Sequence, residues 1–475
     1  MTEVSDNNSN TDKGQRHDQS WGMATIATMP KDDDDDNDDE DQEHHHRNQD
    51  LLDPEKIANI TTTIATTTTS ATTATTTITT SKATKATTNS FSTVLEIDTW
   101  DITKNDIPLP SHVAIRVMDH ADMVLQKRLS EATEALEIFH FETGLARFQN
   151  SELLLGRRIG WGNFADIYEV KRFLPTSPFQ KNCTREQLAA AEELKRTCRP
   201  ESLVVKVLRA QLLSNHSLYA IGAADVVTEG TLLAALDHPN IVSLRGRSVS
   251  GLEGFASGKR DAFFLLFERL DGVLADRMKE WQNRLHQHRI IMGRRDGRIA
   301  LLAERVQFLA QLADAITYLH ERNIIHRDLK LSNVGMDSKG RPKLFDFGLA
   351  KILPPNISGK ETFLLTTNTG SVRYMAPEIG RGEKYNLKAD VFSFAMLLYE
   401  VLSLGKVWDG CSPTDIREKV HIRKHRPTIS MFWPAPLRDL LKATWSDVPA
   451  ARLGMKHVHT ILCKFLKDME TDSSH

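Results

Sequence analysis

HRDLKLSN at residues 326–333, DFG at 346–348 and APE at 376–378 are the runs that decide how this sequence folds. The first run follows a long helical pattern at 301–322, and DFG follows the short apolar run KLF. In this order the chain presents a carboxylate (Asp328), a lysine (Lys330), an amide (Asn333) and a second carboxylate (Asp346). Carboxylate and amide oxygens suit Mg²⁺, and a carboxylate beside a lysine suits the passage of a charged phosphoryl group to a hydroxyl. The series therefore predicts a phosphoryl-transfer site.

The residues ahead of this series have strand character. LLLGRRIG at 153–160 and ADIYEV at 165–170 flank the glycine-containing turn GWGNFA, where N–H groups can approach phosphate oxygens. LVVKVL at 203–208 and FFLLFE at 263–268 are rich in β-branched and aromatic residues, as strands are. Beyond residue 270 the pattern is mostly helical. We therefore expect an α+β molecule with segregated lobes, and the strand–turn–strand context of the glycines excludes a Rossmann site.

Together these motifs resemble the signature of eukaryotic protein kinases, over about residues 153–467. The resemblance implies a bilobal fold, with a small antiparallel-sheet N-lobe (about 153–270) that has one main helix, and a larger helical C-lobe (about 271–467). It implies ATP and Mg²⁺ as cofactors, protein substrates, and a role in intracellular signalling. Lys330 and GSVRYMAPE at 370–378 resemble serine/threonine kinases. The turn HPNIVSLRG at 238–246 and the YMAPE ending are similar to the tyrosine-kinase-like branch of that class.

The resemblance also implies roles for the residues of the HRD and DFG runs. Asp328 resembles the catalytic base that orients the substrate hydroxyl, and Lys330 resembles the lysine that contacts the γ-phosphate. Asn333 and Asp346 are similar to the two Mg²⁺ ligands.

The phosphate-binding lysine and the adenine site follow by the same resemblance. Lys206, in the strand VVKV, resembles the lysine that holds the α- and β-phosphates. Glu229 is the best-placed acid to pair with it, and Asp225, one helical turn earlier, is the alternative. Ala165 replaces the usual third glycine of the loop. The expected ATP-binding set is Ile159, Gly160, Gly162, Ala165, Ile167, Lys206, Glu268 and Leu270.

Other members of the motif set resemble structural residues. Glu378 of APE is expected to pair with Arg452, and Asp390 is expected to brace the HRD backbone. Phe267 stands at the end of the FFLLF strand, where a bulky side chain predicts a closed back pocket. Leu233 is expected to pack towards Phe347 of DFG.

Control by phosphorylation is also predicted. Arg327 precedes the expected base, and such an arginine can pair with a phosphorylated residue of the activation loop. The hydroxyls of ETFLLTTNTGS at 361–371 include Thr366 and Thr367, which spacing favours over Thr362 and Thr369. A further kinase would then act on this loop.

The periphery is unusual. Residues 1–95 predict a disordered arm, because Asp32–Asp41 is almost wholly acidic and 61–80 is mostly threonine. Residues 96–152 predict a partly helical flanking segment, with one or two amphipathic helices at 114–143 that either pack on the catalytic domain or form a separate docking element. Two inserts are expected. The first, 171–202, carries a charged helix at 184–197, and the second, 284–300, is interpreted as an exposed loop rather than a docking site for acidic partners.

Composition limits the remaining possibilities. A net charge of −3 offers no basic excess for nucleic acid, and no run of 18 apolar residues predicts a membrane span. Four scattered cysteines and a polar, acidic N-terminus favour a reducing compartment, the cytoplasm or the nucleus. A catalytically inactive scaffold is disfavoured because Lys206, Asp328, Asn333 and Asp346 are all intact. A small-molecule kinase is disfavoured by the APE segment.

Overall fold

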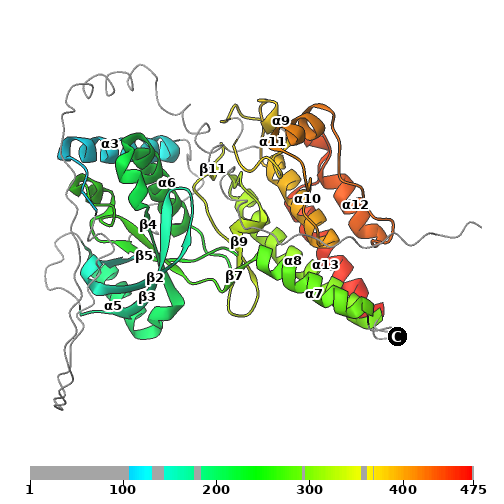
Figure 1. The fold of residues 1–475 in the computed structure, drawn as a ribbon, viewed down its shortest axis with the longest axis horizontal. Coiled ribbons are helices and arrows are strands. Elements are labelled where there is room, and N and C mark those ends of the chain that lie inside the picture. Colours follow the sequence, from blue (N-terminus) through cyan, green and yellow to red (C-terminus); the bar gives the residue numbers. More distant parts are fainter. Residues whose placement is uncertain are drawn as a thin grey trace, which may run out of the picture.

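The computed structural model describes residues 106–130, 144–175, 183–290, 295–354, 361–366 and 369–472 (Figure 1). A strand-rich N-lobe and a helical C-lobe lie side by side, as the sequence predicted. The expected arm at 1–95, including His44–His46, lies outside the described residues, and so does the stretch at 131–143.

The N-lobe is built on a six-stranded sheet with the order β1-β5-β6-β4-β3-β2. The pairs are antiparallel except β1 with β5, which is parallel. The edge strand β1 was not predicted, because it precedes residue 153, where the catalytic domain was expected to begin. The domain boundaries remain predictions. The strands are β1 (Ala146–Phe148), β2 (Leu153–Trp161), β3 (Ala165–Phe173), β4 (Leu203–Leu208), β5 (Leu244–Ser248) and β6 (Phe264–Glu268).

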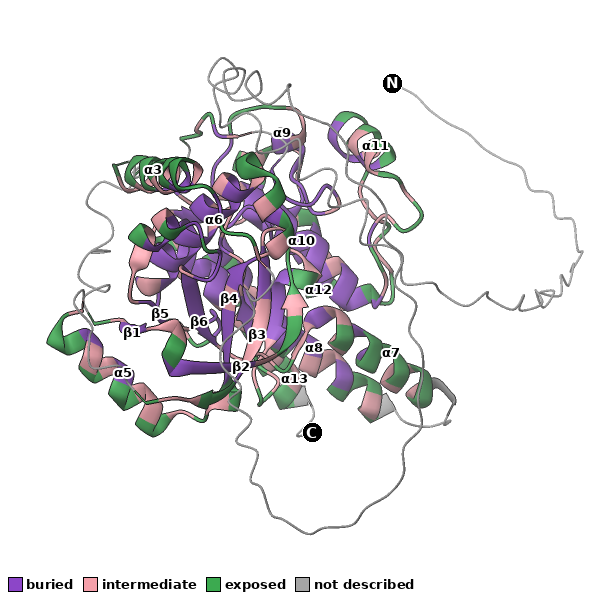
Figure 2. Cartoon of the chain, turned by 60° about the vertical axis from the view of Figure 1, so that its left-hand side comes forward, coloured by how far each residue is buried: buried purple, intermediate pink, exposed green. Residues whose placement is uncertain are grey.

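Helices cover both faces of this sheet (Figure 2). On β4, Val204 and Leu208 belong to the core shared with helix α6 (His216–Ala234), whereas Val205 and Val207 belong to a second core beneath helix α5 (Arg185–Thr197). Residues two apart on a strand share a face, so the two cores lie on opposite sides of the sheet.

The insert helix and the main N-lobe helix both have identifiable caps. The insert helix was predicted at 184–197, and Thr184 caps α5 by accepting a hydrogen bond from the backbone N–H of Gln187. The one main helix expected in the N-lobe is α6, which begins at residue 216. Asn215 caps α6, its side chain accepting from the N–H of Leu218 at 3.1 Å.

The flanking segment forms one described helix, α3 (Ser111–Ser130), which lies against α6 (Figure 1). The flanking segment was expected either to pack on the catalytic domain or to form a separate docking element, and α3 packs on the domain. Beside α3 lies a short 3₁₀ helix, η5 (Gly251–Ser257), inserted between β5 and β6.

The C-lobe is mostly helical, and its central helices are buried. Its longer helices are α7 (Leu274–Ile290), α8 (Arg295–Glu321), α10 (Lys388–Ser403), α12 (Ala435–Thr444) and α13 (Met455–Asp472). Short elements at its edge are α9 (Pro377–Gly380), α11 (Pro413–Ile416) and a π-helix (Arg417–Ile422). Small sheets join β7 (Gly272–Val273), β9 (Val334–Met336) and β10 (Pro342–Leu344), and β8 (Ile324–Ile325) with β11 (Lys351–Ile352).

The prediction of an exposed loop at 284–300 was wrong for 284–290 and 295–300, which are helical, whereas 291–294 lie outside the described residues. Helix α7 continues to Ile290, and α8 already begins at Arg295. Arg284 forms an ion pair with Glu304 of α8 at 2.7 Å, so this basic residue joins the two helices. Arginine and glutamine are good helix formers, and no glycine or proline interrupts the run before residue 293. Among the described helices, none has the combination of length and apolar character needed to cross a bilayer.

Candidate active site

Lys206 and Glu229 form an ion pair between the sheet and α6. Lys206 lies at the centre of β4, opposite Ile167 of β3 and Leu265 of β6, on the face turned towards α6. Its Nζ donates to Glu229 Oε2 at 2.5 Å, and the two side chains are 17% and 4% exposed. Glu229, rather than the alternative Asp225, is therefore the partner of the lysine, as the resemblance to protein kinases implied.

Asp346 completes this cluster from the C-lobe side. Its Oδ1 lies 3.9 Å from Lys206 Nζ, and its side chain is 46% exposed. Burial opposes the positive charge of Lys206, but the Glu229 and Asp346 carboxylates outweigh it and raise the lysine pKa above its ordinary value. Asp346 has φ 65° and Arg327 has φ 69°, left-handed conformations that are uncommon for non-glycine residues and cost backbone strain.

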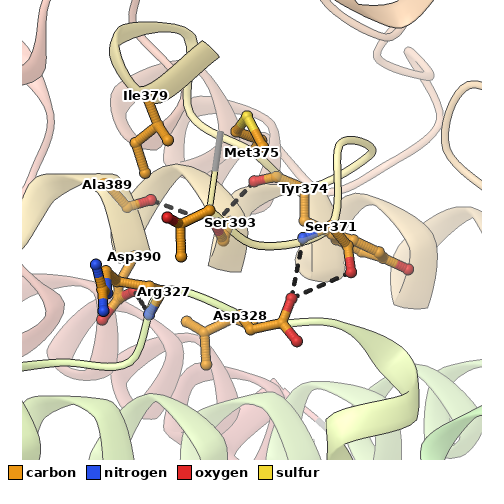
Figure 3. Close-up of a pocket in the computed structure, with 11 residues that line it drawn as sticks. Arg327, Asp328, Ser371, Tyr374, Met375, Ile379, Ala389, Asp390 and Ser393 are labelled. Carbon is orange, nitrogen blue, oxygen red and sulfur yellow. Dashed lines mark hydrogen bonds between the residues drawn. The ribbon is translucent and has the colours of Figure 1, made fainter. Parts of the chain in front are cut away.

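Asp328 is buried and is held from several directions (Figure 3). Its Oδ1 accepts from the backbone N–H of Ser371 at 3.0 Å and from the Ser371 hydroxyl at 3.1 Å. Its Oδ2 accepts from Asn333 Nδ2 at 2.9 Å and lies 3.3 Å from Lys330 Nζ. The structure thus brings the predicted base, the predicted lysine and the predicted amide into one group. Ser371 fixes the carboxylate from the activation-segment side.

The loop that carries Asp328 rests on Asp390 of α10. This buried carboxylate accepts from the backbone N–H groups of His326 and Arg327 at 2.8 and 2.9 Å. Burial alone would raise its pKa, but the bonds from His320 and from the loop hold the Asp390 pKa below its ordinary value. His326 packs edge-to-face on Phe347, with ring centroids 4.8 Å apart. Asp390 thus braces the HRD loop as expected.

The predicted glycine loop is a tight hairpin between β2 and β3. Ile159 and Gly160 lie among the last residues of β2, which ends at Trp161, and Ala165 and Ile167 lie among the first residues of β3. The N–H of Gly162 donates to the carbonyl of Ala165 at 2.7 Å, which closes the turn. Gly160 lies opposite Ile167 in the ladder. Ile167 in turn lies opposite Lys206 of β4, so the turn is close in the sheet to the lysine.

The hinge follows β6. Phe267 is buried, as expected for a closed back pocket. Glu268 Oε1 accepts from the N–H of Ser243 at 2.8 Å and from Lys343 Nζ of β10 at 2.7 Å. Leu270 packs closely on β9, since a Cβ on Gly335 would lie 2.4 Å from Leu270 Cδ1. The Lys343 contact was not anticipated. A lysine inside PKL at 342–344 carries no sequence signal that distinguishes it from a surface residue.

The activation segment is held by Arg327 and by a buried ion pair. Arg327 Nη1 donates to Thr366 Oγ1 at 2.7 Å. Thr367 lies outside the described residues. Glu378 and Arg452 pair through two bonds of 2.7 Å each, as predicted. A cavity of only about 10 Å³, room for one water molecule at most, lies behind the segment (Figure 3).

Asn333 and Asp346 fit the binding of Mg²⁺. This ion keeps several waters and takes few protein oxygens alongside the phosphates of its substrate. Both bonds of Asn333 towards Asp328 use the amide nitrogen, which leaves the amide oxygen to coordinate a cation. The half-exposed carboxylate of Asp346 supplies a second oxygen ligand.

One residue that contacts the site, Arg128, belongs to none of the sequence motifs. Arg128 of α3 donates to the carbonyls of Gly348 and Ala350, directly after Asp346. Asp225 lies nearby on α6. Burial raises the pKa of Asp225 to about 7, against the lowering effect of the Arg128 charge. The apolar residues on every face of α6 were the available signal that another element covers it.

Comparisons with known proteins agree with this geometry. A family model described as the protein kinase domain matches residues 189–461. The chain is 30% identical over 249 residues to mitogen-activated protein kinase kinase kinase 7 of Drosophila melanogaster, covering 51% of this chain and 32% of that protein. It is 36% identical over 222 residues to serine/threonine-protein kinase VIK of Arabidopsis thaliana, covering 46% and 45%. It is 32% identical over 175 residues to serine/threonine-protein kinase STY17 of the same plant, covering 36% and 30%. The chain thus spans less than half the length of these curated relatives.

Proposed function

The chain belongs to the protein kinase family, and on that premise we propose that it is an active serine/threonine kinase that transfers the γ-phosphate of ATP to protein hydroxyls. The proposal rests on one observation, that two groups of the expected catalytic residues are assembled. The Lys206–Glu229 ion pair lies beside Asp346. The Asp328 carboxylate contacts both Lys330 and Asn333. A degraded scaffold would have lost at least one of these groups.

The residues divide the chemistry between them. Asp328 is the base that orients the acceptor hydroxyl and takes its proton. Lys330, 3.3 Å from that carboxylate, offsets negative charge on the phosphoryl group as it passes. Lys206 grips the α- and β-phosphates, and Glu229 holds the lysine in place. When bound through Asn333 and Asp346, Mg²⁺ supplies charge neutralisation on the phosphates.

The adenine site is proposed on the hinge. In this proposal, backbone groups of Glu268 and Leu270 hydrogen-bond the base. Ile159 and Ile167, from β2 and β3, supply apolar contact from the N-lobe side. The bonds that fix Glu268 from Ser243 and Lys343 support this assignment, because they hold the hinge rigid.

Selectivity for serine and threonine is supported by Lys330, by Ser371 and by the similarity to the serine/threonine-protein kinases VIK and STY17. Ser371 binds Asp328 through both its N–H and its hydroxyl, so the segment that receives the substrate is tied to the base. All four cysteines are free thiols, which supports a reducing compartment, the cytoplasm or the nucleus.

The test is transfer of labelled γ-phosphate to a generic protein substrate by purified wild type and by Asp328→Asn. Wild type should label the substrate on serine and threonine, and the variant should lose the signal. Equal labelling by both would identify a contaminating kinase. No labelling by either would favour the scaffold alternative.

Activation by phosphorylation is proposed at Thr366 or Thr367, acted on by a further kinase or by the chain itself. The 2.7 Å bond from Arg327 supports Thr366, because a phosphate on that oxygen would gain a charge-assisted bond from the guanidinium. Replacing both threonines by alanine should lower the activity of the purified kinase. Unchanged kcat in the double variant would contradict the proposal.

A further inference from the structure

Helix α6 is buried on all sides, although only one of its faces meets the sheet. Gly222 marks the sheet face, because a Cβ there would lie 3.2 Å from Leu208 of β4. Ala224, Val227 and Thr231 lie roughly opposite Gly222 by helical periodicity, yet they are only 4%, 2% and 5% exposed. A helix that is apolar all round requires cover on its outer face.

Helix α3 supplies that cover. Its Ala114, Val117 and Ala121 follow the 3–4 spacing of one helix face and are at most 2% exposed. They belong to the same apolar core as Ala223 and Val227 of α6. Alanines at these positions allow the two helices to approach closely. Figure 2 shows the outer side of α3 exposed and α6 buried beneath it.

The start of α3 is fixed to the insert around η5. Asp106 pairs with the buried guanidinium of Arg260, which also donates to the carbonyl of Leu208 at 3.0 Å. The N–H of Leu109 donates to the carbonyl of Gly258 at 2.9 Å. Gly258 has φ 72°, and a Cβ on it would lie 2.4 Å from the carbonyl oxygen of Leu109, so this contact needs glycine.

The end of α3 reaches the DFG segment. Arg128, half-buried in the last turn, donates from Nη1 to the carbonyls of Gly348 at 3.4 Å and Ala350 at 3.2 Å. Asp225 of α6 lies against the same segment, since a Cβ on Gly348 would lie 3.8 Å from the Cβ of Asp225. The positive charge of Arg128 acts on the Asp225 carboxylate as well. Three elements therefore meet at one guanidinium: α3, α6 and the residues that follow Asp346.

We propose that α3 is a built-in brace for the active arrangement, and that Arg128 is the positioning residue that couples it to the DFG segment. An outward movement of α6, or a displacement of residues 346–350, would break the Arg128 bonds and uncover the apolar face of α3. The brace therefore favours molecules in which Lys206 is paired with Glu229 and Asp346 lies beside the lysine. This inference rests on the proposed kinase function and adds to it a device that lies outside the matched family region, residues 189–461.

The test compares three variants of the full chain. Arg128→Ala removes the coupling. Lys127→Ala is the matched control, because this neighbouring basic residue is exposed on the same turn. Arg128→Lys keeps the charge and can still donate to one carbonyl. Amide hydrogen exchange over residues 216–234 and 344–352, the melting temperature, and kcat and KM for ATP are measured for each.

Arg128→Ala should speed amide exchange roughly tenfold in these two segments and lower kcat/KM for ATP by a similar factor, while Lys127→Ala stays within about twofold of wild type. Arg128→Lys should recover part of both losses. Equal exchange in Arg128→Ala and Lys127→Ala would overturn the proposal. So would faster exchange spread over both lobes with a lower melting temperature, because that pattern indicates general destabilisation. Amide exchange is measured without catalytic turnover. It therefore tests whether Arg128 couples α3 to the DFG segment even if the wild-type chain transfers no phosphate.

Discussion

Arg452→Met is expected to cost far more stability than the loss of a surface ion pair. The Arg452 and Glu378 side chains are 0% and 1% exposed and share two 2.7 Å bonds. Arg452 also donates to the carbonyls of Ser446 and Lys388, each at 2.8 Å. The methionine fills most of the volume but leaves a buried carboxylate without its counter-ion. Breaking a buried pair from one side costs about 3–5 kcal/mol, which for a domain of this size is a fall in Tm of roughly 6–10 °C.

Thermal unfolding of the full chain, followed by tryptophan fluorescence at one scan rate, measures this loss. Lys456→Met is the control, because Lys456 and Glu321 form a 3.1 Å pair whose side chains are 76% and 52% exposed. That variant should cost less than about 1 kcal/mol. A double variant, Glu378→Leu with Arg452→Met, removes both charges and should recover most of the stability. The reasoning is refuted if Arg452→Met melts with the control, or if the double variant is no more stable than the single one.

Three further perturbations have expected outcomes. Glu229→Gln removes the negative partner of Lys206, so kcat/KM for ATP should fall roughly ten- to a hundredfold, and unchanged kinetics would contradict the assigned pairing. Burial raises the pKa of Glu400 to about 7, so the stabilisation from its bound proton is complete below about pH 4.5 and is lost as the pH rises through 7. Relative to wild type, Glu400→Gln should therefore gain up to about 3 kcal/mol of unfolding free energy between pH 5 and pH 8, and parallel pH profiles would rule this out. A Cβ on Gly380 would lie 1.9 Å from His421 Nδ1, so Gly380→Ala should cost about 1–3 kcal/mol, and His421→Ala should suppress that cost in a double-mutant cycle.

The site residues that belong to the sequence motifs could be predicted, because these motifs occur in a fixed order along the chain. Asp328 and Asn333 lie together and Asp346 lies beside Lys206, in keeping with the order of the motifs, and the resemblance to protein kinases had favoured Glu229 as the partner of Lys206. The Glu378–Arg452 pair was predictable for a related reason. A carboxylate in APE and a late arginine are both parts of the motif set.

Docking between distant segments could not be predicted in the same way. An amphipathic pattern shows that α3 has one face to bury, but not that α6 receives it or that Arg260 anchors its start. The wrong assignment of 284–300 has another cause. The charged and polar composition suggested a loop. The run of helix-forming residues instead extends α7, and Arg284 of α7 forms an ion pair with Glu304 of α8.

Helix α5 packs on the face of the N-lobe sheet opposite to α6, and this limits the substitutions that the strands of the sheet can accept. In an antiparallel sheet with one face in water, every second residue can become polar with little effect. On β4, Leu203, Val205 and Val207 face the core under α5 and are at most 1% exposed. A saturation-mutagenesis screen for folding should therefore find no alternation along β4. Tolerance should be low at every position of this strand, and Lys206 should be the one charged residue that it accommodates.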